Sequence, residues 1–491
     1  MSQYVLSCDE GTSSARAVAF DREARAAATS QCPVESSFPR SGWVEQDAEQ
    51  IWQTQLVVAK DAALRCGGWQ AIAAIGITNQ RETTIVWDRS SGEPVAPAIV
   101  WQCRRTTEIC DELAADGNAD KVTECTGLVL DPYFSGTKIG WILDNVPDAR
   151  VRAEAGELAF GTVDSWLVYR LSGGKAHVID RTNASRTLLM NLRTGSWDSA
   201  MLDMLGVPSS MLPAIVPSCG VMATTDGNLF GAEIPIAGIA GDQQAALFGQ
   251  ACFRPGLVKN TYGTGCFALM HTGNNASRSE HRLLSTTAAS GPGSNQFALE
   301  GAVFVAGAVV QWLRDELGLI ASAAESEQAA LSVCDTQGVY LVPAFTGLGA
   351  PYWNAGARGV MTGLTRGASR NHIVRAALES IAYQTRDLVE AMESDSGSGL
   401  GELRVDGGAT ANDFLMQFQA DILGVPVVRP SYLETTALGA AFLAGLATGF
   451  WSGTDELEQF WSVDRTFEPG MSELRREELY AGWKAAVGRS L

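Results

Sequence analysis

The sequence lacks several features that would assign it to a specialised class of protein. Its ten cysteines are scattered without a Cys-x-x-Cys pair, and its four histidines show no metal-ligand spacing. No uncharged apolar run reaches the length of about 18 residues that crosses a membrane, and no basic segment with an apolar core opens the chain. These absences argue against a disulfide scaffold, a zinc site, a membrane protein and an exported protein. We expect a cytoplasmic protein with reduced thiols.

Basic residues are also scarce. The chain carries 36 Lys and Arg against 55 Asp and Glu, which gives a formal net charge of −19. Because nucleic-acid binding requires a basic surface, we expect no nucleic-acid partner. A small anionic ligand is compatible with this charge, since a few loop amides, a metal ion and one or two arginines can bind it.

What the sequence does contain is a long chain with enough apolar residues for more than one core. It has 491 residues, of which 46% are hydrophobic. A chain of this length normally divides into domains, and two large ones are expected here. We place them at residues 1–245 and 246–491.

A mid-chain segment joins an expected strand to an expected helix. Residues 234–240 are a short apolar run typical of a buried strand, and residues 245–249 begin an apolar helix. Asp242 and Gln243 lie between them. Ligands of open α/β sheets bind at the carboxyl ends of strands, so Asp242 is a candidate to face a substrate. The alternative is that Asp242 only caps the next helix.

Two Gly- and Thr-rich turns, about half a chain apart, each join a pair of expected strands. The first lies between strands at 4–8 and 17–20, and the second, at 263–265, lies between strands at 256–262 and 266–270. Glycine lets the backbone approach a ligand, and hydroxyl and N–H donors suit phosphate oxygens. In the first turn these groups come from Thr12, Ser13, Ser14 and Arg16, and Asp9 is placed to hold Mg²⁺ through water. The alternative is a plain hairpin turn.

A third Gly-rich turn, at residues 405–412, precedes a helix and leaves room for a flat group. Three such loops in this order are the pattern of the actin-like ATPase architecture. Residues 301–318 are expected to be a helix, with Gly307 and Gln311 on one face that admits a nucleotide. The alternative for Gly307 is tight helix packing. Further helices are expected at 369–392, 434–441 and 472–491.

Polar and aromatic residues that suit a hydroxylated substrate lie between the first two turns. Arg81 and Glu82 follow a buried strand at 73–77 and could serve as donor and acceptor for hydroxyl groups. Trp101 adjoins polar residues, and Tyr133 lies in a polar loop that leads into a helix. Taken singly, the charged pair favours a solvated ion pair, and Trp101 is as compatible with a core residue as with a pocket wall.

The chain resembles the FGGY family of carbohydrate kinases nearly from end to end. Residues 133–145 fit the first family signature, and residues 359–364 with 372–379 fit the second. The resemblance implies an α/β fold with two actin-like (ribonuclease H-like) ATPase domains facing across a cleft. It also implies phosphoryl transfer from ATP with Mg²⁺. Stretches such as ITNQRETTIVW and RVDGGATAN resemble those of members that act on glycerol, so the resemblance implies glycerol as the acceptor, in glycerol catabolism.

The resemblance also implies roles for individual residues. Asp242 would be the general base. Glycerol hydroxyls would be held by Arg81, Glu82, Tyr133, Asp242 and Gln243, and its carbon backbone enclosed by Trp101 and Phe267. The nucleotide would contact Thr12, Ser13, Ser14, Arg16, Thr264, Gly307, Gln311, Gly408 and Asn412. A homodimer or homotetramer is also implied.

Two positions depart from the family pattern. Glu10 stands where members commonly carry Gln, and we expect it to point away from the phosphates or to assist Mg²⁺. Glu233 occupies the Arg position of members inhibited by fructose 1,6-bisphosphate, so we expect no such inhibition here. The open alternatives are a kinase for another polyol or sugar, such as xylulose, ribulose or erythritol, and an actin-like ATPase that uses ATP only to change shape. The sequence is silent on a further role as a regulatory partner of a transporter.

Overall fold

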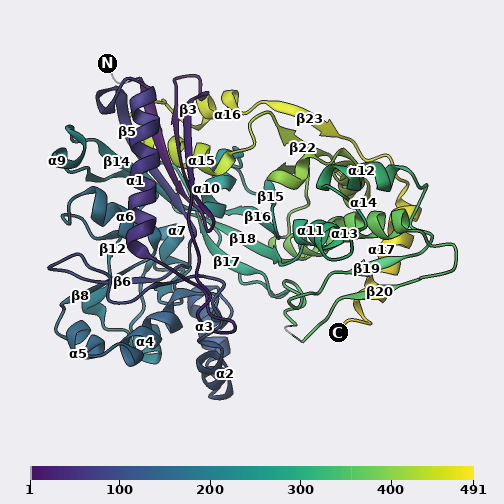
Figure 1. The fold of residues 1–491 in the computed structure, drawn as a ribbon, viewed down its shortest axis with the longest axis horizontal. Helices are drawn as coiled ribbons and strands as arrows, with labels where there is room; N and C mark the ends of the chain where they lie inside the picture. The colour runs from purple at the N-terminus through teal and green to yellow at the C-terminus, as the bar shows by residue number, and fades with distance from the viewer. Residues whose placement is uncertain (1–2, 355) are drawn as a thin grey trace.

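The computed structural model describes residues 3–354 and 356–491, and each half of this chain contains one large mixed sheet (Figure 1). The first sheet has the strand order β13-β14-β5-β1-β2-β3. Its central strands β14, β5 and β1 are parallel, whereas β2, β3 and β13 run antiparallel to their neighbours. In chain order the strands are β1 (Tyr4–Glu10), β2 (Ser14–Phe20), β3 (Ala26–Pro33), β5 (Ile72–Asn79), β13 (Cys219–Thr224) and β14 (Pro235–Gly241).

The second sheet repeats this plan. Its order is β17-β18-β16-β15-β21-β22-β23, with an antiparallel β18-β16-β15 set followed by the parallel strands β21 and β22. The β15–β16 turn therefore occupies the place that the β1–β2 turn has in the first sheet, as the repeated Gly/Thr turns predict. The strands are β15 (Val258–Tyr262), β16 (Cys266–Gly273), β17 (Leu284–Ala288), β18 (Gln296–Val303), β21 (Leu403–Asp406), β22 (Val427–Pro430) and β23 (Val463–Phe467).

Strand register brings the candidate residues of the first half to one edge of its sheet. Glu10 at the end of β1 pairs with Asn79 at the end of β5, and Gly241 at the end of β14 pairs with the same Asn79. The residues that follow β5 and β14 include Arg81 and Asp242. They leave the sheet side by side because the carboxyl ends of parallel strands share an edge.

Two helices that cross through small residues connect the halves. Helix α10 (Asp242–Gly249) follows β14, and α15 (Thr435–Ala447), from the C-terminal half, packs on the first sheet, where Figure 1 shows its yellow ribbon against the N-terminal strands. A Cβ atom on Gly439 would overlap the carbonyl oxygen of Ala245, and one on Gly249 would overlap that of Thr435. The two helices therefore cross in backbone contact, which only glycine permits at these points.

The expected helix at 301–318 is wrong at its start. Residues 301–303 belong to β18 and pair with residues 266–268 of β16, and helix α11 begins at Gly307 and ends at Asp315. Pairing with β16 continues to Val303 and outweighs any local helical preference of these residues. The other expected helices are present as α13 (Arg370–Ser396), α15 and α17 (Glu473–Val487).

The remaining elements cover the two sheets or extend the N-terminal half below its sheet in the view of Figure 1. The helices are α1 (Ala48–Arg65), α2 (Thr107–Ala115), α3 (Ala119–Thr126), α4 (Ser135–Asn145), α5 (Ala149–Glu154), α6 (Val163–Leu171), α7 (Arg181–Ala184), α8 (Ser199–Leu205), α9 (Gly227–Phe230), α12 (Ala323–Leu331), α14 (Asp413–Leu423) and α16 (Thr454–Phe460). Short strands are β4 (Glu45–Gln46), β6 (Ile85–Asp88), β7 (Ala98–Ile99), β8 (Leu158–Gly161), β9 (Val178–Asp180), β10 (Met190–Asn191), β11 (Ser196–Trp197), β12 (Ala214–Val216), β19 (Tyr340–Val342) and β20 (Val360–Thr362).

The cysteines and helices agree with the composition. All ten cysteines are unpaired thiols, as expected. Among the described residues, no helix combines the length and apolar character that a membrane span requires. The expected division between residues 245 and 246 falls within α10 and stays a prediction.

Candidate active site

Asp242 is the first residue of α10 and does not act as its cap. Gly241 takes the N-cap position, and the Asp242 carboxylate accepts from the backbone N–H and the side-chain amide of Gln243, at 2.8 and 3.3 Å. Its side chain is 34% exposed, although the rest of α10 is almost entirely buried. A half-exposed carboxylate at a helix N-terminus is favourably placed in the helix dipole and is free to meet a ligand.

Arg81 and Glu82 lie beside Asp242 and are not a solvated surface pair. Their side chains are only 2% and 3% exposed. Arg81 Nε lies 3.0 Å from Asp242 Oδ1 and 3.7 Å from Glu82 Oε1. The structure thus brings together a donor, an acceptor and the candidate base, the three kinds of group that a hydroxylated substrate needs.

Three charged residues that the sequence analysis did not single out complete this cluster. Glu300 accepts from Arg81, and Arg186 donates to Glu82. Lys259 Nζ donates to Gln243 Oε1 at 2.5 Å. Glu300 interrupts the apolar strand β18, which is a signal that could have found it, whereas Lys259 lies in a strand with two other polar residues. No comparable signal marks Arg186, which follows the short helix α7.

Burial and neighbouring charges set the protonation of these residues. Burial would raise the pKa of Glu300, but the guanidinium groups of Arg186 and Arg81 lower it to about 2. Burial lowers the pKa of Lys259 to about 8, against the opposing effect of Asp406 and other carboxylates. Glu300 is therefore ionised at neutral pH. Lys259 loses its positive charge as the pH rises through about 8.

The aromatic candidates connect the acceptor residues to the first turn. The Trp101 and Tyr133 rings meet edge to face with centroids 5.6 Å apart, and Trp101 Nε1 donates to Thr12 Oγ1 at 2.9 Å. Tyr133 also lies under the Arg186 guanidinium, whose carbon is 5.8 Å from the ring centroid. Phe267 is half-buried on β16 of the second sheet.

The first turn is a tight hairpin at the end of β1. The Gly11 N–H donates to Ser14 O at 3.0 Å, while Thr12 and Ser13 occupy the turn itself and are partly or fully exposed. Arg16, on β2, pairs with Glu434, the residue that precedes α15. The turn thus offers exposed donors and one arginine, as expected for a phosphate loop, and its arginine is shared with the C-terminal half.

The second turn is packed against α11. The exposed Thr264 accepts the backbone N–H groups of Ala306 and Ala308 through its carbonyl oxygen. A Cβ atom on Gly307 would lie 2.6 Å from Gly263 O, so Gly307 is needed for this packing, which was the alternative considered for it. The first backbone N–H groups of α11, those of Gly307 and Ala308, are therefore bonded to the turn, and the turn itself leaves Thr264 exposed as a candidate donor.

The remaining nucleotide candidates lie in the C-terminal half. Gln311 is exposed on α11, and Asn412 caps α14, accepting from Leu415 N–H at 2.9 Å. Gly408 is exposed in the third Gly-rich turn, and a Cβ atom there would meet nothing within 4 Å. This open backbone allows the approach of a flat group that the sequence analysis predicts.

Asp9 and Glu10 follow one another at the end of β1. Burial raises the pKa of Asp9 to about 6 against the effect of Arg16, and the Asp242 carboxylate adds to the rise. Glu10 is fully buried, and neither of its carboxylate oxygens has a hydrogen-bond partner among the described residues. The role of Glu10 relative to the phosphates and Mg²⁺ stays a prediction. Burial and the Asp9 carboxylate raise its pKa well above the usual value.

The donor set fits a magnesium ion held mainly by water and phosphate. Within the described part of the chain, no three His, Cys, Asp or Glu side chains gather as a metal cluster. Mg²⁺ is usually held by one or two carboxylates together with substrate phosphates, and the Asp242 carboxylate is close enough to Asp9 to raise the pKa of Asp9.

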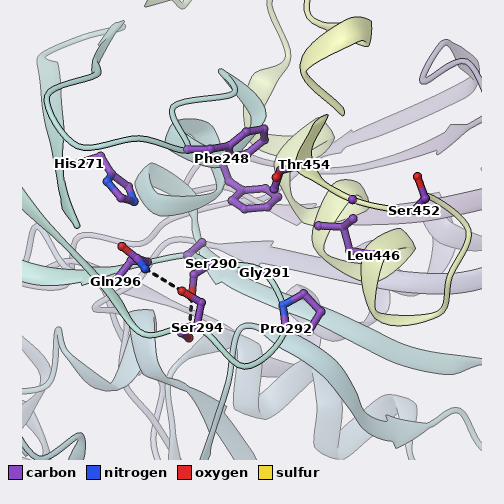
Figure 2. Close-up of a pocket in the computed structure, with 13 residues that line it drawn as sticks. Phe248, His271, Ser290, Gly291, Pro292, Ser294, Gln296, Leu446, Ser452 and Thr454 are labelled. Carbon is purple, nitrogen blue, oxygen red and sulfur yellow. Dashed lines mark hydrogen bonds between the residues drawn. The ribbon is translucent and has the colours of Figure 1, made fainter. Parts of the chain in front are cut away.

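A separate cavity lies away from these residues. It has a volume of about 340 Å³ and is lined by Phe248, His271, Ser290, Gln296 and Leu446 among others, at the far ends of α10 and α15 (Figure 2). Burial lowers the pKa of His271 to about 4, so this side chain is neutral at physiological pH. The cavity holds none of the candidate residues and offers no charged group for phosphate.

Comparison with known proteins gives matches along the whole chain. Residues 4–249 match the model of the "FGGY family of carbohydrate kinases, N-terminal domain", and residues 258–448 match the C-terminal domain of the same family. The chain is 60% identical to a glycerol kinase of Shewanella sp. (strain ANA-3) over 99% of both chains. It is 58% identical to one of Caldanaerobacter subterraneus subsp. tengcongensis, covering 100% of this chain and 99% of the relative.

Solved structures agree with the fold. A glycerol kinase of Plasmodium falciparum, solved with ADP, superposes with a TM-score of 0.94 at 36% identity, over 99% of this chain and 98% of that one. A xylulose kinase of Lactobacillus acidophilus gives a TM-score of 0.88 at 23% identity, over 97% and 95%, which bears on the fold alone. The expected two-domain α/β architecture is confirmed.

Proposed function

Because the chain belongs to the FGGY family of carbohydrate kinases, we propose that it transfers the terminal phosphoryl group of ATP to glycerol and forms sn-glycerol 3-phosphate. The support for this acceptor is that relatives 58–60% identical over nearly the full chain are glycerol kinases. The support for the nucleotide is the 36% identical glycerol kinase solved with ADP.

The observation that carries the proposal is the placement of Asp242 against Arg81. A half-exposed carboxylate lies 3.0 Å from a buried guanidinium at the carboxyl edge of the first sheet. Asp242 accepts the proton of the attacking glycerol hydroxyl as general base, and Arg81 and Glu82 orient the hydroxyl groups by donating and accepting hydrogen bonds. Tyr133 and Gln243 add further polar contacts to the acceptor.

The three-carbon backbone of glycerol has a short apolar edge that also needs a surface. Trp101 and Phe267 supply aromatic faces for it, one from each half of the molecule. Because the Trp101 indole donates to Thr12, a ring that contacts the acceptor also supports the first phosphate turn. Acceptor and nucleotide are thereby held in one frame, which favours direct transfer.

The phosphates are held by the two turns. Thr12, Ser13 and Ser14 donate from the first turn, Thr264 from the second, and Arg16 adds positive charge. Gly307, Gln311, Gly408 and Asn412 contact the rest of the nucleotide. Mg²⁺, when bound near Asp9, neutralises phosphate oxygens and so favours transfer.

An acceptor panel tests this function directly. ADP formation is measured in a coupled assay with glycerol, xylulose, ribulose, erythritol or no acceptor. We expect strong stimulation by glycerol and little by the others. An ADP release that is the same with and without every acceptor would favour the actin-like ATPase alternative, and stimulation by a sugar alone would reassign the acceptor.

A further inference from the structure

Four buried charged side chains form a closed ring beside Asp242, and two of them have no role in the scheme above. Glu300 accepts from Arg81 at 2.6 and 3.0 Å and from Arg186 at 3.0 Å. Glu82 accepts from Arg186 Nε at 2.9 Å and lies 3.7 Å from Arg81 Nε. Each carboxylate therefore contacts both arginines, and each arginine contacts both carboxylates.

Stability alone does not account for this ring. All four side chains are at most 3% exposed, and burying an ion costs several kcal/mol that its partners only partly return. Nη1 of Arg186 is buried and has no hydrogen-bond partner among the described residues, which adds a further cost. Apolar side chains of similar size would often be at least as stable in such a place.

The ring does fix the orientation of the two residues proposed to hold the acceptor. Glu300 and Gln244 occupy the terminal nitrogens of Arg81, at distances of 2.6 to 3.1 Å. Only Nε is left to face Asp242, at 3.0 Å. Glu82 is held in turn by Arg186, which donates to it through Nε. Neither Arg81 nor Glu82 can therefore rotate without breaking a charged hydrogen bond.

The ring also joins the two sheets. Arg81, Glu82 and Arg186 belong to the first half of the chain, whereas Glu300 lies on β18 of the second sheet. Resting on the proposed function, we propose that Arg186 and Glu300 are positioning residues of the acceptor site, which hold Arg81 and Glu82 in their working orientation and couple that orientation to the contact between the halves.

Arg186→Lys separates charge from geometry. Lysine keeps the positive charge but cannot bind Glu82 and Glu300 together through a planar fork. We expect the KM for glycerol to rise about tenfold or more, as the loss of one charged hydrogen bond implies, while the KM for ATP and the melting temperature stay close to wild type. The matched control is Arg170→Lys, because Arg170 also donates to carboxylate through two nitrogens, but to the single glutamate Glu49 and from α6.

Glu300→Gln supplies the second arm of the test. It keeps the size of the side chain but removes the charge that both arginines share, and the double variant Arg186→Gln with Glu300→Gln restores the charge balance if the single variant is unstable. We expect both to weaken glycerol use more than ATP use. A glycerol kcat/KM within about twofold of wild type in Arg186→Lys and in a folded Glu300 variant would overturn the inference. A wild-type enzyme without glycerol-dependent ADP formation would instead overturn the proposed function.

Discussion

Replacing Asp242 with Asn tests the general base with the least disturbance of the site. Asn has the same size and keeps an oxygen that can accept the Gln243 N–H, now 2.8 Å away. Arg81 loses one negative neighbour but keeps Glu300 at 2.6 and 3.0 Å and Glu82 at 3.7 Å. The buried guanidinium therefore stays compensated, and we expect the variant to fold and to bind glycerol.

The magnitude follows from what Asp242 does in each state. In the ground state it contributes one hydrogen bond among several, so we expect the KM for glycerol to change by less than about fivefold. In the transition state it takes a proton, and losing a general base costs about 10²- to 10⁴-fold in rate. That corresponds to about 3 to 5 kcal/mol of barrier, and it should appear almost entirely in kcat.

The assay is ADP formation at saturating ATP over a range of glycerol concentrations. The control is Asp203→Asn, because Asp203 is an exposed residue of α8 in the same half of the chain and contacts none of the candidate residues through a described side-chain bond. A kcat within about threefold of wild type for Asp242→Asn would refute the base assignment. A kcat near wild type with a much higher KM would instead make Asp242 a binding residue.

Three further predictions concern charge. Burial lowers the pKa of Lys259 to about 8, so the folded protein releases this proton at a lower pH than the unfolded chain does. The contribution of Lys259 to stability therefore rises with pH above 8. The melting temperature of wild type minus that of Lys259→Met should increase between about pH 8 and 10. Glu434→Gln frees Arg16 for phosphate and should lower the KM for ATP up to about fivefold, whereas an unchanged KM would mean the pair does not compete with ATP. Asp9→Asn should raise the Mg²⁺ concentration for half-maximal activity about tenfold with an unchanged KM for glycerol; an unchanged Mg²⁺ requirement would remove Asp9 from the metal site.

Local composition was sufficient for the parts of the site that form within one stretch of chain. The Gly- and Ser-rich turn after β1 and the Asp242 junction after β14 were both predicted, because turn residues and apolar runs report local backbone geometry. The repeat of the turn between β15 and β16 also predicted the second sheet, since two similar turns imply similar pairs of flanking strands.

Contacts between distant segments could not be predicted in this way. The Arg81–Glu300 pair joins residues 219 positions apart, and Glu300 lies in a strand whose final residues were expected to be helical. Gly307 was expected to give access to a nucleotide, but its lack of a side chain is also required for the contact with Gly263. Sequence periodicity reports which face of an element is buried, but not which element buries it.

The distribution of charge between the halves bears on how the site can open. From the first half, Arg81 and Arg186 are balanced by Glu82 and Asp242, and from the second sheet Lys259 is balanced by Glu300. For these six side chains the formal charges of each half sum to zero when Lys259 is protonated, although Asp406 also acts on Lys259 and Asp9 lies close to Asp242. A movement that separates the halves breaks the hydrogen bonds from Arg81 and Arg186 to Glu300, but it also admits water, which weakens the interaction between the separated charges and hydrates each of them. Lys259→Met removes this balance from the second half alone.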